Sequence, residues 1–256
     1  MRHSRYGKFN FRLISQPGAQ SSSVGGTTVA TFDSLPLGNV TTPYDSPIGT
    51  YDASSISPFS VQAANQWGGA TNGTTTTNYF ALGAQSGTSA PVSVTLNLPA
   101  DYFGFWWSAG DVNNGISLYT GDSLLAHFTT QMLVTLLNGG SGHVTAIDGA
   151  TYSSSSYYGN PNTGEDTSEP FAFVDIVATG LTFDRIVFDN NGTTGTGFES
   201  DNHTVTSEPV TLSGDHVFVG NLDVAAPEPT PVMLLAGGLA LLATVRRRGL
   251  AALPRR

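Results

Sequence analysis

The chain has 256 residues and no cysteine, which excludes disulfides, thiolate nucleophiles and thiolate metal sites. Nine of its ten basic residues lie in the first twelve or the last eleven positions, and Arg185 is the exception. The region between holds all nineteen acidic residues and a net charge of −18. Such a region repels nucleic acid, so we expect no nucleic-acid partner.

The N-terminal segment, residues 1–26, is basic and then polar. A secretory leader would continue with an apolar core of about seven to fifteen residues, but residues 15–28 are polar and glycine-rich. We interpret this segment as a misassigned or truncated leader whose true start lies upstream, or as an atypical leader.

Residues 27–222 are predicted to form one all-β domain, because short β-branched and aromatic runs alternate with turn signals. Residues 92–98 alternate apolar and polar side chains, which is typical of a half-buried strand ended by Pro99. Residues 132–137 could be a strand or one helical turn, and residues 141–164 read as a long loop. The pattern favours a β-sandwich of the jelly-roll type. The other predicted strands cover residues 27–32, 59–63, 79–82, 102–108, 115–120, 124–130, 171–178, 185–189, 198–205 and 210–219.

A four-residue run, Gly121-Asp122-Ser123-Leu124, spells the GDSL motif of a hydrolase family. In that family the serine is a nucleophile near the N-terminus of an α/β domain, and an Asp-x-x-His completes the triad. Here the run lies mid-chain between two predicted strands, and no Asp-x-x-His follows. We therefore interpret it as a hairpin turn. The five histidines show no zinc-binding spacing, and no catalytic residue is assigned.

Four acidic residues at predicted strand ends are candidate ligands for a structural Ca²⁺: Asp33, Asp189, Glu199 and Asp201. Ca²⁺ takes six to eight oxygen ligands from carboxylates, amides and carbonyls. The first and last strands of a jelly roll often lie close together, so Asp33 could meet Asp201. The alternative is that all four are solvated turn residues of an acidic domain.

Aromatic side chains suggest a sugar-binding surface. Trp106 and Trp107 lie in one predicted strand, and Tyr157 and Tyr158 in the long loop. Flat rings can stack on sugar faces. Neighbours in a strand point to opposite faces, so we expect one tryptophan in the core and the other exposed. The alternative is that the whole strand packs in the core.

The C-terminal end has three parts in a fixed order. A linker, residues 223–230, contains Pro227, Glu228, Pro229 and Thr230, and an apolar run follows over residues 231–245. As a helix this run spans about 22 Å, short of the bilayer core of about 30 Å, and snorkelling side chains could extend it. The tail, residues 246–256, opens with Arg246, Arg247 and Arg248, which favour the cytoplasmic side.

This order resembles the PEP-CTERM sorting signal of Gram-negative envelope proteins. The resemblance covers about the last tenth of the chain and implies an exosortase as partner, export, a transient anchor in the inner membrane and delivery to the cell surface or medium. An ordinary C-terminal anchor is the alternative. Short segments of the body, such as Phe32-Asp33 and Phe198-Glu199, also resemble the β-sandwich cargo of such proteins.

The family setting implies exopolysaccharide and biofilm. We therefore expect a non-enzymatic surface protein with a matrix-binding or structural role and exopolysaccharide as a partner. A secreted hydrolase acting on polysaccharide or esters is the alternative, and a bulk surface coat is a third reading.

Overall fold

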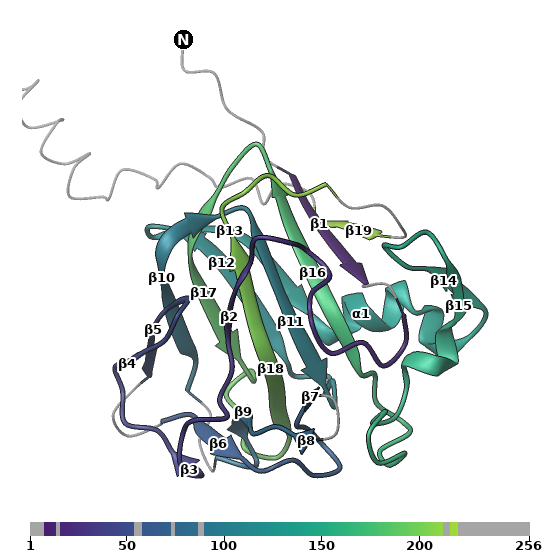
Figure 1. The fold of residues 1–256 in the computed structure, drawn as a ribbon, viewed down its shortest axis with the longest axis horizontal. Helices are drawn as coiled ribbons and strands as arrows, with labels where there is room; N and C mark the ends of the chain where they lie inside the picture. The colour runs from purple at the N-terminus through teal and green to yellow at the C-terminus, as the bar shows by residue number, and fades with distance from the viewer. Residues whose placement is uncertain are drawn as a thin grey trace, which may run out of the picture. The chain divides into compact units, whose positions relative to one another are not determined.

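The computed structural model describes residues 8–13, 16–53, 58–72, 75–86, 90–211 and 216–219. The predicted sorting motif, apolar run and basic tail lie outside these residues. Among the described residues no helix is long and apolar enough to cross a membrane. The body is all-β and is built mainly from two large antiparallel sheets (Figure 1).

The larger sheet has nine described strands, with β2 paired to β18 at the side of the main order. Along the sheet the other strands are β19 (His216–Val219), β1 (Lys8–Leu13), β16 (Ala172–Thr179), β11 (Tyr102–Ser108), β18 (Gly197–Thr206), β9 (Tyr79–Gly83), β6 (Ser60–Gln62) and β3 (Gly38–Asn39). β2 covers Thr28–Ala30. β2, in the first predicted strand of the domain, pairs with β18, which contains the predicted strand at residues 198–205.

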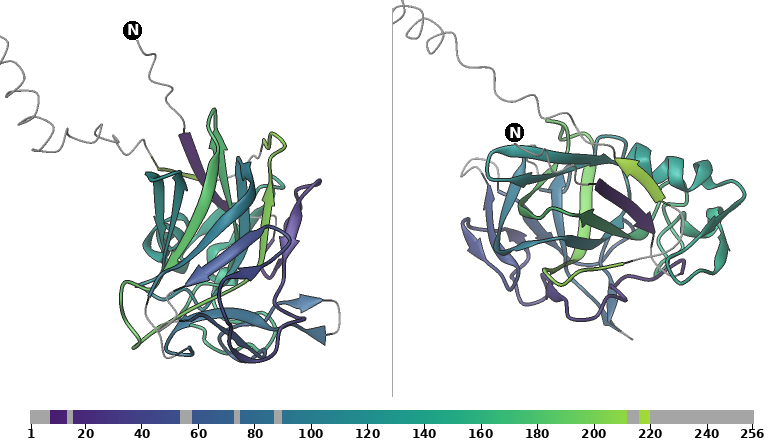
Figure 2. Two further views of the ribbon diagram at one scale, coloured as in Figure 1. Left: turned by 90° about the vertical axis from the view of Figure 1, so that its left-hand side faces the viewer. Right: turned by 90° about the horizontal axis from the view of Figure 1, so that it is seen from above.

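The smaller sheet has six described strands. Their order is β13 (Ser123–Thr129), β12 (Gly115–Thr120), β17 (Phe183–Asp189), β10 (Val92–Ala100), β5 (Gly49–Ala53) and β4 (Tyr44–Asp45). Two short hairpins and three helical segments complete the described body: β7 (Thr71–Asn72) with β8 (Thr75–Thr76), β14 (His143–Thr145) with β15 (Thr151–Ser153), α1 (Thr130–Leu136), η1 (Asn138–Gly140) and η2 (Ser154–Tyr157). Helix α1 and the β14–β15 hairpin lie at one side of the strands (Figures 1 and 2).

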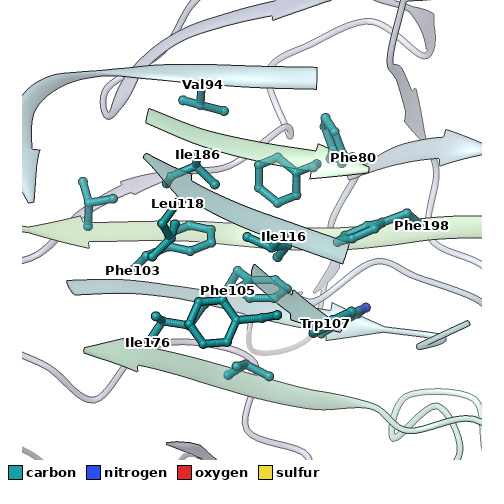
Figure 3. Packing of buried hydrophobic residues seen from close by; sticks show 14 of the residues in the cluster. Phe80, Val94, Phe103, Phe105, Trp107, Ile116, Leu118, Ile176, Ile186 and Phe198 are labelled. Carbon is teal, nitrogen blue, oxygen red and sulfur yellow. The ribbon is translucent and has the colours of Figure 1, made fainter. Parts of the chain in front are cut away.

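The main core lies between the two sheets (Figure 3). Alternate residues of β11, namely Phe103, Phe105 and Trp107, point into it, because successive strand side chains face opposite ways. From the smaller sheet they meet aliphatic side chains such as Ile116 and Ile186. Trp107 stacks on Phe198 of β18 with ring centroids 5.5 Å apart. Burial of these rings excludes water from the space between the sheets.

The chain passes repeatedly from one sheet to the other. β9, β11, β16 and β18 belong to the larger sheet, whereas β10, the β12–β13 hairpin and β17 belong to the smaller one. The resulting orders are β16-β11-β18-β9 and β13-β12-β17-β10. Neighbours within each sheet are therefore far apart in sequence, and the core forms only when both sheets assemble.

A second layer covers the outer face of the larger sheet. The other residues of β11 face this side, and Trp106 packs there with Ala70, Phe171 and Phe173 in a smaller cluster. Tyr102 on the same face donates a hydrogen bond to Asp175 at 2.6 Å and contacts the Ser22 hydroxyl at 2.7 Å. Loops from three parts of the chain thus turn an outer sheet face into a buried one.

Several predicted elements need correction. β10 continues through Pro99 to Ala100, and its register with β17 shifts between Thr95 and Ala100. That irregularity accommodates a residue without an N–H group. β1 lies in the segment that we predicted to precede the domain, and it pairs with β16 and β19. Residues 130–136 are helical, and the predicted long loop contains the β14–β15 hairpin.

Candidate functional site

The predicted aromatic surface is wrong for both tryptophans. Trp106 and Trp107 do point to opposite faces, but each is fully buried because loops cover the outer face as well. Tyr157 is buried, and Tyr158 is half-buried and packs against the main core. Trp106, Trp107 and Tyr157 therefore offer no open ring face for a sugar.

The four predicted calcium ligands do not form one group. Asp189 belongs to the smaller sheet, whereas Glu199 and Asp201 lie on β18 of the larger sheet. The exposed Asp33 accepts a hydrogen bond from the backbone N–H of Asn78 at 3.0 Å. Across the described ranges, no group of three or more His, Asp or Glu residues has a metal-binding arrangement.

Asp201 has a structural role in the outer layer. Its carboxylate accepts hydrogen bonds from the Thr77 hydroxyl at 2.7 Å and from the backbone N–H of Asn202 at 2.7 Å. Its burial raises its pKa to about 7, although these hydrogen bonds lower it. Asp201 therefore ties the loop before β9 to the sheet.

A serine and a histidine also meet inside the main core. The Ser200 hydroxyl lies 2.9 Å from His203 Nε2, and the Tyr51 hydroxyl lies 2.8 Å from His203 Nδ1. All three residues are fully buried, and burial lowers the pKa of His203 to about 3. Because rings such as Phe188 surround the imidazole, substrate has no access and this contact is structural.

One pocket combines an exposed ring with buried polar groups. It has a volume of about 420 Å³ and lies where β9 and β11 end and β18 begins. Trp67 is 41% exposed at this pocket. The remaining lining residues are Ala84, Gln85, Ala109, Asp111, Glu169, Gly195, Thr196, Gly197 and Glu199. We call this the Trp67 pocket.

Glu199 is the most deeply buried acid of the Trp67 pocket. It is 2% exposed, and its Oε1 accepts a hydrogen bond from Gln85 Nε2 at 2.7 Å. Gln85 is in turn hydrogen-bonded by the Tyr79 hydroxyl. A Cβ at Gly197 would collide with Glu199 Oε1, so the absence of a side chain there makes room for the carboxylate. Burial, followed by the charges of Asp111 and Glu169, raises the pKa of Glu199 well above its usual value.

Glu169 and Asp111 form a second acidic group at the same pocket. Burial and a hydrogen bond with Asp166 raise the pKa of Glu169 to about 8, and Glu169 also hydrogen-bonds Asp111. Asp111 accepts a hydrogen bond from the backbone N–H of Gly197 at 3.1 Å. A carboxyl group with a pKa of about 8 favours its protonated form at neutral pH, so Glu169 can donate a hydrogen bond as well as accept one.

The backbone that carries Trp67 is held from two sides. The buried Asn160 donates hydrogen bonds to the carbonyls of Asn65 at 3.1 Å and Gln66 at 3.0 Å. The Asn65 side chain accepts from the backbone N–H of Trp67 at 2.8 Å. This support fixes the position of the loop, which favours a preformed binding surface.

Trp67 was not identified as a candidate binding residue from the sequence. Its position was the available signal. A tryptophan that lies among polar and glycine residues, outside any predicted strand, is expected to be at least partly exposed. No comparable signal predicted that Asp111, Glu169 and Glu199 would line one pocket, because they come from three distant parts of the chain.

Comparisons with known proteins identify no family. No family model matches the sequence, and no curated protein is similar to it. One solved structure is similar: the catalytic domain of a GH87 alpha-1,3-glucanase in complex with tetrasaccharides, at 14% identity and a TM-score of 0.32. The alignment covers 78% of this chain and 29% of the glucanase chain.

Proposed function

We propose that this chain is an exported surface protein whose body, a jelly-roll β-sandwich, binds glycans in the Trp67 pocket. The strand orders support the jelly-roll assignment, because the chain alternates between the sheets and each order interleaves distant strands. The C-terminal Pro-Glu-Pro, apolar run and arginines support sorting by an exosortase. In this proposal the mature domain belongs to an exopolysaccharide matrix.

The exposed ring of Trp67 beside a polar pocket is the observation that carries glycan binding. An indole face buries the C–H groups of a sugar, and neighbouring polar side chains hydrogen-bond its hydroxyls. Asp111, Glu169, Glu199 and Gln85 provide such polar groups at the same pocket. The rigid loop keeps the ring in place before a ligand arrives.

Hydrolysis of the bound glycan is the alternative function. Glycosidases use two carboxyl groups separated by about 5 Å or more, so that a sugar or water fits between them. Asp111 and Glu169 instead hydrogen-bond each other directly. Their contact favours a binding role, and product analysis after incubation with each bound glycan is the direct check for the hydrolase alternative.

The experiment is a glycan-array screen of the purified chain, followed by affinity measurement on the best ligand. Trp67→Ala is expected to weaken binding by at least about tenfold, since loss of ring stacking costs about 1.4 kcal/mol or more. Trp67→Phe keeps a ring and should retain part of the affinity. Leu37→Ala is the matched control, because Leu37 is also exposed but lies outside the pocket. Unchanged affinity in Trp67→Ala would reject this site.

A further inference from the structure

The Trp67 pocket has acidic but no basic lining residues. Asp111, Glu169 and Glu199 line it, and Asp166 lies close enough to Glu169 to hydrogen-bond it. Among the residues whose side chains the structure describes, Arg185 is the only lysine or arginine. It lies over the Tyr119 ring at 4.1 Å, on the smaller sheet. A cation brought by the ligand would therefore meet no competing positive charge at the pocket.

Glu199 gives this acidic pocket a specific acceptor. The residue is 2% exposed, yet it lines the pocket. Its Oε1 accepts a hydrogen bond from Gln85 Nε2 at 2.7 Å, and a carboxyl group has further acceptor sites that a ligand can use. A buried carboxylate oxygen is stabilised by a donor, and a charged donor stabilises it most. The geometry thus places a nearly buried carboxyl group in the lining of a pocket that also has an aromatic ring.

We infer that the Trp67 pocket binds an amino sugar through its free, protonated amino group, with the ammonium donating to Glu199 and the sugar ring lying against Trp67. This inference rests on the proposed glycan binding and adds the chemical class of the ligand.

An ammonium group suits this pocket better than the other charged groups of glycans. It offers three donors to carboxylate and amide oxygens, and it is attracted by an indole face. An N-acetylated amine has one donor and no charge. A uronic acid or a sulfated sugar would bring a negative charge into a pocket whose lining includes acidic residues and no basic residue to neutralise it.

The test is calorimetric titration of the full chain with glucosamine oligosaccharides and with their N-acetylated counterparts of the same length. Galacturonic acid oligosaccharides serve as the anionic comparison. The glucosamine ligands are expected to bind at least about tenfold more tightly than the N-acetylated ones, a difference of about 1.4 kcal/mol. The anionic ligands are expected to bind most weakly.

Glu199→Gln tests the residue itself, because it removes the ionisable carboxyl group and keeps the size of the side chain. This variant is expected to lose the preference for the free amine and to retain Trp67-dependent binding of the N-acetylated ligand. Glu169→Gln is the second acidic variant, in case Glu199→Gln does not fold. Glu165→Gln is the matched control, since Glu165 is exposed and does not line the pocket.

The outcomes separate the two proposals. Equal affinity for aminated and N-acetylated ligands, lost in Trp67→Ala, would overturn the amino-sugar inference and leave glycan binding standing. No binding of any glycan would overturn both. Binding of Ca²⁺ alone, lost in Glu199→Gln, would show that the acidic groups hold a metal ion and would overturn the inference.

Discussion

At the scale of single residues, two carboxyl groups have pKa values near or above neutral pH: Glu169 in the Trp67 pocket and Asp201 in the outer layer. Burial and hydrogen bonding raise the pKa of Glu169 from 4.5 to about 8, and burial raises that of Asp201 from 3.8 to about 7. The folded state therefore binds these protons more tightly than the unfolded state does. Their contribution to stability is complete below the unfolded pKa values and is lost as pH rises through the folded ones.

We therefore expect the melting temperature to fall as pH rises from about 5 to about 8. Glu169→Gln should flatten this dependence and raise the melting temperature at the alkaline end, because an amide cannot ionise. Calorimetric melts across this range provide the measurement, with the exposed Glu165→Gln as the control. An unchanged slope in Glu169→Gln would contradict the assignment of the retained proton to Glu169.

The pH dependence of stability that His203 contributes has the opposite sign. Its folded pKa of about 3 lies below the ordinary 6.5, so the folded state resists protonation of this side chain. Its contribution is complete above pH 6.5 and declines as pH falls toward about 3. Stability lost as pH falls through the acidic range is therefore due to His203. Stability lost as pH rises through neutral and alkaline pH is due to the carboxyl groups.

At this scale the sequence predicts the direction in which a strand side chain points better than it predicts the residues that surround it. Alternation along β11 correctly indicates that Trp106 and Trp107 face opposite sides. It cannot reveal that loops bury Trp106, since Ala70 and Phe171 reach it from distant parts of the chain. The acidic pocket could not be predicted for the same reason, because its residues come from distant parts of the chain. The exposure of Trp67 could have been predicted from its position outside the predicted strands.

At the scale of elements, strand β1 closes a part of the larger sheet. Its six residues pair with β16 on one side, and four of them pair with β19 on the other. Without β1, the long apolar strand β16 would become an exposed edge with unpaired N–H and C=O groups. Exposed apolar edges promote association between molecules.

A chain shortened to begin at residue 27 is therefore expected to melt at a lower temperature and to self-associate. Light scattering and thermal melts, compared with a chain that begins at residue 8, provide the measurement. A chain that begins at residue 8 but ends at residue 211 lacks β19, the second neighbour of β1, and serves as the control. Equal solubility and melting temperature after loss of β1 would contradict its role in the sheet.

Local signals predicted the elements well wherever pattern and turn chemistry agreed. The predicted boundaries of residues 102–108 match β11, and Gly121-Asp122 forms the turn of the β12–β13 hairpin. β1 does alternate polar and apolar residues, from Lys8 to Leu13, as β10 does. It was not predicted because the basic segment that contains it was interpreted as a leader that precedes the domain.

At the scale of the whole molecule, the proposal joins a glycan-binding body to a sorting signal. The signal predicts that the mature protein loses its C-terminal end near Pro227 to Thr230. The intact mass and both termini of the protein recovered from cell envelope and medium provide the measurement. A chain that keeps Arg256 and stays in the inner membrane would contradict exosortase sorting and would support an ordinary anchor.

The all-β class was predictable from the many short strands, and this prediction is confirmed. The order of strands within the sheets was not fixed by local pattern, because each large sheet interleaves distant segments. The position of the Trp67 pocket follows from that order: the ends of β9 and β11 meet the start of β18 only in the assembled sheet.

The central claim is that glycans bind at Trp67, and the three tryptophans of the chain allow a direct test. An NMR spectrum of the labelled indole N–H groups should show three signals, with that of Trp67 identified by its loss in Trp67→Phe. On titration with glucosamine oligosaccharides, and with each glycan selected by the array, the Trp67 signal is expected to shift. Those of the buried Trp106 and Trp107 should stay in place. Binding that leaves the Trp67 signal unchanged would contradict the account and place the glycan site elsewhere.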